Sequence, residues 1–194
     1  MSRIIAGSAK GRRLTAPKGT HTRPTTDWVK EALFSALASW FGTADEASGD
    51  QLAGVAVLDL FAGSGALGLE AASRGAAPVT CVDTHTAGII RDNAGRAGLR
   101  VHVVAGKAEH AVARHEGAVD LVLVDPPYDV PGAALEKLLG ELVAGDLLAS
   151  QALVVIERSS RSAAPQWPAV FTRSWDRRYG ETTLHFGATD QEQP

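Results

Sequence analysis

Short apolar runs alternate with segments of helical periodicity along the middle of the chain, and this alternation restricts the fold more than any other feature. The runs are almost uniformly apolar, as expected of strands that are buried on both faces. Repeated strand–helix units predict a doubly wound, mostly parallel α/β sheet with helices on both sides. The five expected strands are Val55–Leu60, Val79–Val82, Val101–Val104, Val119–Val124 and Leu153–Ile156.

The two ends of the chain do not follow this pattern. We expect a basic extension with a short β-hairpin at residues 1–27 and the main domain at residues 28–194, beginning with a helix at Trp28. The tail is expected to add an antiparallel hairpin that completes a sheet of seven strands. The remaining expected elements are helices at Leu67–Arg74, His85–Ala97, residues 107–115 and residues 135–142, and strands at Ala169–Trp175 and Thr182–Phe186.

Composition excludes several classes of protein. The chain has 194 residues, of which 45% are hydrophobic and 21% charged, and this suits one globular domain with a real core. No apolar run approaches the roughly 18 residues that span a bilayer, and the N-terminus lacks a signal-peptide pattern. A lone cysteine, Cys81, excludes an internal disulfide, and the histidines show no zinc spacing. We expect a cytoplasmic monomer with no metal and no membrane partner.

Charge is distributed unevenly along the sequence. Residues 1–30 contain seven bases and one acid, a net charge of +6, whereas the other 164 residues carry −9. A basic arm on an acidic body is a candidate local surface for phosphate groups. A solvated tail explains the charge equally well.

A glycine-rich turn follows the first expected strand of the main domain. Gly63 to Gly68 fits the G-x-G-x-x-G dinucleotide fingerprint, in which glycines let the backbone approach a ligand at a helix N-terminus. Glycines kept only for tight helix–strand packing are the alternative. Asp59 would repel a pyrophosphate, so it favours a cationic ligand such as the ammonium end of S-adenosylmethionine. Asp83, at the end of the second strand, suits ribose hydroxyls or the cap of the next helix.

The fourth strand leads directly into Asp125-Pro126-Pro127-Tyr128, the most specific signal in the chain. The two prolines stiffen the turn and remove two N–H donors. The Asp125 carboxylate and the Pro126 carbonyl are then placed to accept hydrogen bonds from an exocyclic amine, while Tyr128 stacks on its base. Orienting an amine in line with a methyl donor is what N-methylation requires. The alternative is a plain turn with a core tyrosine.

These motifs, in this order, resemble class I S-adenosylmethionine-dependent methyltransferases that modify exocyclic amines. With the N-terminal run they are similar to the RsmD family of bacterial 16S ribosomal RNA guanine-N2 methyltransferases, and the resemblance covers nearly the whole chain. The motifs of the main domain are Asp59-Leu60-Phe61-Ala62-Gly63-Ser64-Gly65, Val82-Asp83 and Asp125-Pro126-Pro127-Tyr128. The N-terminal motifs are Arg3-Ile4-Ile5-Ala6-Gly7, Lys10-Gly11-Arg12-Arg13-Leu14, Thr22-Arg23-Pro24-Thr25-Thr26-Asp27 and Glu31-Ala32-Leu33-Phe34.

The resemblance implies a Rossmann-like class I fold and one methyl transfer to N2 of a guanine in 16S rRNA. Its partner would be the small ribosomal subunit or an assembly intermediate of it. Catalytic roles would fall to Asp125, Pro126 and Tyr128. The cofactor would be S-adenosylmethionine, bound by Asp59, Phe61, Gly63, Gly65, Asp83, Lys107, Ala108, Thr25 and Thr26. RNA phosphates would be held by Arg3, Lys10, Arg12, Arg13 and Arg23.

One position departs from the family pattern. Many relatives carry an acidic residue after the third strand that bonds the adenine amine, whereas this chain has Lys107. We therefore expect backbone atoms of Lys107 and Ala108 to hold the adenine ring. The tail residues Arg177, Arg178 and Tyr179 either extend the RNA surface or form a solvated hairpin tip.

Three other functions fit part of the sequence. A nicotinamide-dependent oxidoreductase explains the glycine-rich turn but not Asp59 or Asp125-Pro126-Pro127-Tyr128. An adenine-N6 DNA methyltransferase shares that second motif, but the chain has no evident target-recognition domain. A non-catalytic ribosome-assembly factor would leave the intact motif unexplained.

Overall fold

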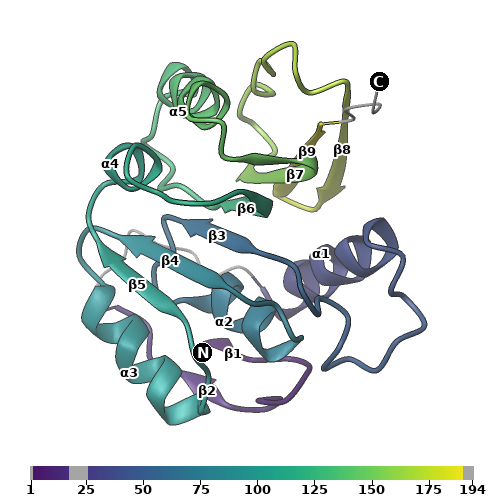
Figure 1. The fold of residues 1–194 in the computed structure, drawn as a ribbon, viewed down its shortest axis with the longest axis vertical. Helices are drawn as coiled ribbons and strands as arrows, with labels where there is room; N and C mark the ends of the chain where they lie inside the picture. Colours follow the sequence, from purple (N-terminus) through teal and green to yellow (C-terminus); the bar gives the residue numbers. More distant parts are fainter. Residues whose placement is uncertain (1, 18–25, 190–194) are drawn as a thin grey trace.

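A seven-stranded sheet forms the centre of the protein, in a computed structural model that describes residues 2–17 and 26–189 (Figure 1). The strand order is β5-β4-β3-β6-β7-β9-β8, the first five strands are parallel, and β9 runs antiparallel to both of its neighbours. The doubly wound sheet with an antiparallel C-terminal hairpin is therefore confirmed. The strands are β3 (Val57–Leu60), β4 (Val79–Asp83), β5 (His102–Ala105), β6 (Val119–Val124), β7 (Leu148–Ser159), β8 (Arg173–Tyr179) and β9 (Thr182–Ala188).

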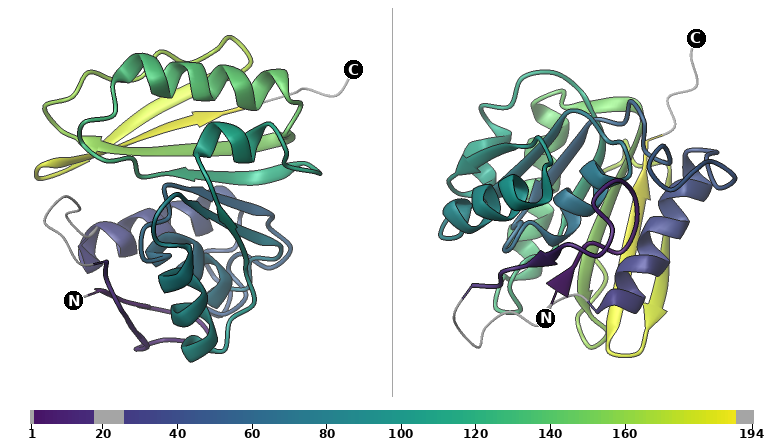
Figure 2. Two further views of the ribbon diagram at one scale, coloured as in Figure 1. Left: turned by 90° about the vertical axis from the view of Figure 1, so that its left-hand side faces the viewer. Right: turned by 90° about the horizontal axis from the view of Figure 1, so that it is seen from below.

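Helices cover both faces of the sheet. The first three contribute to one apolar cluster and the last two to another. Figures 1 and 2 show the two layers of helices from three directions. Side chains that alternate along β3 divide between the clusters: Val57 packs toward α1 and α2, whereas Leu58 and Leu60 pack toward α4 and α5. The helices are α1 (Asp27–Trp40), α2 (Ala66–Ser73), α3 (Ala87–Ala97), α4 (Ala108–Val112) and α5 (Gly132–Ala144).

Among the elements whose boundaries differ from those expected, three differ for a clear physical reason. The helix predicted at residues 107–115 ends at Val112, because the chain turns away toward Gly117, which has a φ of +86°. Strand β7 is longer than Leu153–Ile156, because the hairpin strand β9 pairs with it as far as Ser159. Strand β8 begins only at Arg173, since the residues before it form a turn that buries Phe171 against α5. No helix among the described residues is long and apolar enough to cross a membrane.

The basic N-terminal segment is folded onto the domain. Strands β1 (Ser2–Arg3) and β2 (Arg13–Leu14) pair antiparallel, which confirms the short hairpin. Ile4 and Leu14 are buried together with Leu69 of α2 and Ala94 of α3 in a third apolar cluster. The segment therefore contributes to the core as well as to the charge of the surface.

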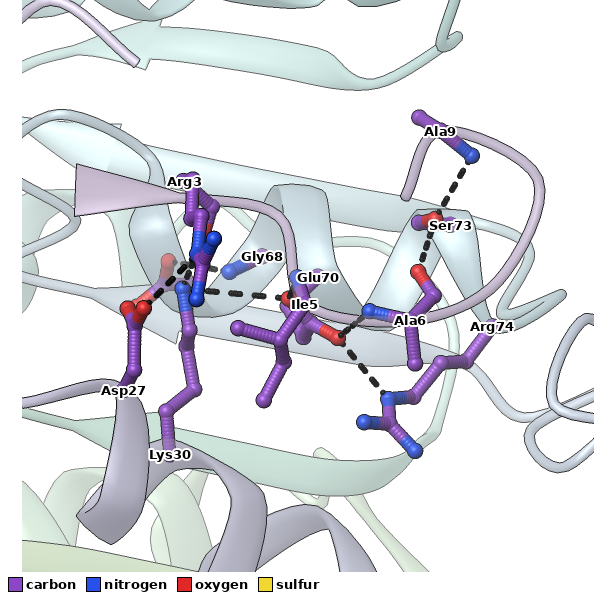
Figure 3. A network of polar contacts seen from close by, with 11 residues as sticks. Arg3, Ile5, Ala6, Ala9, Asp27, Lys30, Gly68, Glu70, Ser73 and Arg74 are labelled. Carbon is purple, nitrogen blue, oxygen red and sulfur yellow. Dashed lines mark hydrogen bonds and ion pairs between the residues drawn. The ribbon is translucent and has the colours of Figure 1, made fainter. Parts of the chain in front are cut away.

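A buried carboxylate anchors this segment to α2 (Figure 3). Glu70 accepts hydrogen bonds from the backbone N–H groups of Ile5 (2.7 Å) and Ala6 (3.0 Å) and from Nε of Arg74 (3.0 Å). Lys30 lies 3.8 Å from the same carboxylate, and both side chains are fully buried. Burial lowers the pKa of Lys30, against the opposing effect of Glu70. One of the seven N-terminal bases is thus a core residue, inaccessible to RNA.

Candidate active site

A cavity of about 520 Å³ opens at the carboxyl ends of the parallel strands, beside β3 and β6, where the strand order reverses. Ligands of open α/β sheets bind at this switch point, and the volume lies within the usual range for small-molecule sites. The loops after β3, β4, β5 and β6 all contribute walls. Residues of the cavity that these loops and strand ends supply are Phe61, Gly63, Val82, Asp83, Thr84, His85, Thr86, Gly106, Lys107, Ala108, Glu109, Asp125, Pro126, Pro127, Tyr128 and Val130.

The glycines of the fingerprint have different tasks. Gly63 lines the cavity with a φ of +57°, and a Cβ there would meet nothing nearer than 4.0 Å. Gly65 does not line the cavity: a Cβ at this position, whose φ is +80°, would press on Leu69 and Ile90 at 3.1–3.2 Å. At Gly68 a Cβ would lie 2.4 Å from the Cys81 sulfur. Open space for a ligand therefore occurs at Gly63, whereas the other two glycines permit close packing of α2 on the sheet.

Asp59 lies beneath the turn, on the α2 side of β3, and is 1% exposed. Its Oδ2 accepts a hydrogen bond from the Gly68 N–H (2.9 Å), and its Oδ1 is buried without a partner among the described residues. Burial raises the pKa of Asp59 to about 7; the Gly68 bond opposes that rise and the charge of Asp83 adds to it. Asp59 is not among the residues that line the cavity, because it sits one residue before the strand end and alternates away from it.

The Asp83 carboxylate organises the next loop. Its Oδ1 accepts backbone N–H groups of His85 (2.8 Å) and Thr86 (3.0 Å), and its Oδ2 accepts the N–H of Gly63 (3.0 Å). A carboxylate has about four acceptor positions, so one remains for a ligand hydroxyl at the cavity wall. The two roles considered for Asp83, contact with a ligand and support of the start of α3, are compatible in this geometry.

The loop after β5 supplies an acidic residue that sequence reasoning did not select. Lys107 and Ala108 line the cavity, and so does Glu109, two residues after the position where an acid was missing. Glu109 lies in the first turn of α4 and is half-buried. Its carboxylate is an acceptor available to an exocyclic amine on this side of the cavity.

The Asp125-Pro126-Pro127-Tyr128 segment forms the opposite wall, and all four residues line the cavity. The Tyr128 side chain is 60% exposed, so the alternative of a core tyrosine is excluded. An exposed aromatic ring beside a carboxylate and a proline carbonyl is well suited to hold a flat base with its amine turned inward.

Strands β7 and β9 and the N-terminal segment complete the cavity. No local sequence pattern predicts that the residues they contribute would lie there. Glu157 and Arg158 come from the end of β7, Thr182 from the start of β9, and Pro17 from the chain after β2. The Arg158 Nη1 is buried and has no hydrogen-bond partner in the described part of the chain. The pairing of β7 with β6 and β9 brings Glu157, Arg158 and Thr182 to the cavity, and that pairing is non-local.

The four expected RNA-contact residues that the structure describes do not line the cavity. Lys10, Arg12 and Arg13 are exposed on the N-terminal hairpin. Arg3 is also exposed, but its Nε lies 2.8 Å from the Asp27 carboxylate.

Of the expected site residues that directly precede α1, only Thr26 lies within the described part of the chain. Arg23 and Thr25 lie outside the described residues. The Thr26 side chain caps α1 by accepting the N–H of Val29 at 3.3 Å.

Asn93 of α3 ties the N-terminal segment to the glycine-rich turn. Its side-chain amide accepts the Thr15 N–H (2.9 Å) and donates to the carbonyls of Thr15 (3.0 Å) and Ser64 (2.8 Å). The segment that follows the hairpin and the turn that carries Gly63 are therefore linked through one side chain. Within the described ranges no group of three or more histidine, cysteine or acidic residues is placed to hold a metal ion.

Comparison with known proteins gives consistent matches over nearly the whole chain. A family model described as "Conserved hypothetical protein 95" matches residues 2–188. Ribosomal RNA small subunit methyltransferase D of Escherichia coli (strain K12) is 36% identical over 170 residues, which cover 86% of this chain and 79% of that protein. A solved structure of a hypothetical protein from Thermus thermophilus has a TM-score of 0.77 at 30% identity, covering 98% of this chain and 100% of that one.

A more distant structure shares the fold. The T. thermophilus 16S rRNA N2 G1207 methyltransferase, solved in complex with AdoMet and guanosine, has a TM-score of 0.66 at 21% identity. The match covers 91% of this chain and 46% of that one.

Proposed function

The chain belongs to the RsmD family, and we propose that it transfers a methyl group from S-adenosylmethionine to the exocyclic N2 of a guanine in 16S ribosomal RNA. The observation that carries this proposal is the wall Asp125-Pro126-Pro127-Tyr128 at the mouth of the switch-point cavity. Two acceptors and an exposed ring at that position match the needs of amine methylation.

The residues present fit S-adenosylmethionine as the cofactor. Asp83 retains one acceptor position for a ribose hydroxyl, and the open side of Gly63 lets the ligand approach the backbone. Lys107, Ala108 and Glu109 would surround the adenine. Phe61 lines the cavity and would contact the cofactor directly, whereas Gly65 would only shape the turn. Thr25 and Thr26 are kept as proposed cofactor contacts. Asp59 would act on the ligand through the turn above it, since it does not line the cavity.

The chemistry needs few protein groups. When bound, the cofactor supplies an electrophilic methyl group on a sulfonium. The Asp125 carboxylate and the Pro126 carbonyl would accept hydrogen bonds from the target amine and so direct its nitrogen toward that methyl group. Nitrogen becomes more acidic once methylated, so its proton can leave without a dedicated base.

The target base must leave its stack to reach this site. Enzymes that act on bases turn the nucleotide outward, at a cost of about a few kcal/mol, and hold it by stacking and by hydrogen bonds. Tyr128 would supply the stacking, and its 60% exposure means that little rearrangement is needed. The exposed bases Lys10, Arg12 and Arg13, with Arg3 and Arg23, would hold the RNA phosphates around the extruded nucleotide.

Arg158 supports the choice of guanine over adenine. Guanine presents O6 and N7 as acceptors, whereas adenine replaces O6 with an amino donor. An arginine only donates hydrogen bonds, and the Arg158 Nη1 at this cavity has no partner among the described residues. A guanine placed with N2 toward Asp125 would offer O6 as an acceptor to this guanidinium, whereas an adenine in the same place would present an amino donor at that position.

One experiment tests the proposal directly. The purified protein would be incubated with methyl-labelled S-adenosylmethionine and, separately, unmethylated small subunits, bare 16S RNA and DNA, and the labelled nucleoside would then be identified. We expect N2-methylguanosine from RNA. Label in DNA adenine would show that the proposed substrate is wrong, and no label in any sample would favour a non-catalytic assembly factor. Tight NADH binding without S-adenosylmethionine binding would favour an oxidoreductase.

A further inference from the structure

One tryptophan stands apart from the other three. Trp28, the second residue of α1, is 61% exposed, although tryptophan is on average a highly buried residue. Trp40 and Trp175 pack against the cluster under α1, and Trp167 packs against the cluster under α5. The indole of Trp28 belongs to neither cluster, so core packing does not explain it.

A second aromatic ring holds Trp28 in a defined orientation. The rings of Trp28 and Tyr179 meet edge to face, with centroids 5.3 Å apart and planes at 87°. Tyr179 is itself half-buried and packs against the core. The exposed indole is therefore held by a packed partner. Because its orientation is already fixed, the indole loses less conformational entropy when a base stacks on it.

The aromatic pair lies beside the cavity. Tyr179 ends β8 and is the antiparallel partner of Thr182, which lines the cavity. Paired residues on antiparallel strands have Cα atoms about 5 Å apart. The start of α1 and the β8–β9 turn lie along the same edge of the molecule as the N-terminal hairpin (Figure 2, right). A nucleotide next to one that enters the cavity would reach this edge.

Basic side chains flank the pair. Arg177 and Arg178 are exposed on β8 immediately before Tyr179, and Arg178 is held over the turn by a bond from its Nε to the Gly180 carbonyl (3.1 Å). Arg3 is paired with Asp27, the residue next to Trp28. An exposed aromatic ring with arginines around it is the arrangement that binds single-stranded nucleic acid, through stacking on the base and contact with its phosphate.

We propose that Trp28, braced by Tyr179, is a stacking platform for a base that flanks the methylated nucleotide in the RNA substrate. Arg177 and Arg178 contact the adjoining phosphates. The inference rests on the proposed function, since RNA opened for methylation presents unstacked bases at this edge. On this proposal the β8–β9 hairpin helps to select the RNA site, a role separate from the methyl transfer at the cavity.

Two variants of Trp28 separate stacking from other roles. Trp28→Phe keeps an aromatic face, whereas Trp28→Leu keeps an apolar side chain without one. Methyl transfer to unmethylated small subunits would be measured for both variants and the wild type. We expect Trp28→Leu to raise KM for subunits about 5- to 150-fold, the range for loss of one stacked base, with kcat nearly unchanged. Trp28→Phe is expected to stay within a few-fold of the wild type.

Controls and the remaining outcomes test the platform further. Both variants should bind S-adenosylmethionine by calorimetry and melt as the wild type does, because the side chain is exposed. An active wild type with an unchanged KM in Trp28→Leu would overturn the platform alone and leave the exposed ring to a protein partner. An equal rise in both variants would also overturn it, since phenylalanine can still stack. A wild type that methylates no subunit would refute the proposed function and the platform together.

Discussion

Replacing Asp59 by asparagine tests the electrostatics beneath the glycine-rich turn. The carboxyl is 1% exposed, has one oxygen without a partner among the described residues, and keeps its proton to a pKa of about 7 because of burial. Asparagine has nearly the same shape, and its amide oxygen can still accept the Gly68 N–H. The substitution therefore removes the titration and leaves the packing in place, and any cost of burying the amide is independent of pH.

The magnitude follows from the two pKa values. In the unfolded chain Asp59 titrates near its ordinary value of 3.8, and in the folded chain near 7. Between these values only the unfolded chain has released the proton, so the free energy of unfolding falls as pH rises, by about 1.4 kcal/mol per unit. The loss reaches about 4 kcal/mol by pH 7 and changes little above it. The variant lacks this loss, so its stability relative to the wild type should rise by about 2 kcal/mol from pH 5 to pH 7.

Urea unfolding of both proteins at several values between pH 5 and pH 8.5 measures this difference. Taking the difference cancels every other titrating group that the two proteins share. Asp45→Asn, at an exposed position, is the matched control and should give no such trend. If the two stability curves for Asp59→Asn and the wild type run parallel, the carboxyl is charged in the folded protein and the reasoning from burial is wrong.

Three other predictions concern the reaction. Asp125→Asn should lower kcat about a hundredfold or more with little change in subunit affinity; near-normal turnover would contradict its role on the amine. The wild type should methylate RNA with 2-aminopurine at the target, a base that keeps N2 and lacks O6, about tenfold less efficiently than RNA with guanine there. Arg158→Met should abolish this difference, and a variant that still shows the full difference would refute contact with O6. Arg12→Ala with Arg13→Ala should reduce the salt slope of RNA binding by about 0.7–0.9 per lost phosphate contact, and an unchanged slope would show that these bases are only solvated.

Much of the fold could be predicted because its signals are local. Strand β6 has the expected bounds, Val119–Val124, since an apolar run between turns needs no distant partner to be recognised. The boundaries that failed depend on pairing and packing across the chain: β9 lengthens β7, and burial of Phe171 delays the start of β8. Such contacts join segments far apart in sequence, so periodicity does not reveal them.

The candidate site likewise contains residues that the sequence predicted and residues that only the tertiary structure revealed. The residues after β4, β5 and β6 were expected at one edge, because parallel strands place their carboxyl ends together, and the cavity does contain Asp83, Lys107 and Asp125. Glu109 and Arg158 were not selected, since nothing in their neighbouring residues marks them as cavity walls. Their positions depend on how α4 begins and on the register of the last strands.

Local sequence was enough to set the order of strands and helices, the glycine-rich turn and the Asp125-Pro126-Pro127-Tyr128 wall. These features depend on residue type and spacing, which act within a few residues of the chain. Long-range packing was needed to fix the burial of Lys30, the placement of Asp59 under the turn and the contact of Trp28 with Tyr179. Each depends on groups that are distant in sequence and close in space, where desolvation and ring packing set the outcome.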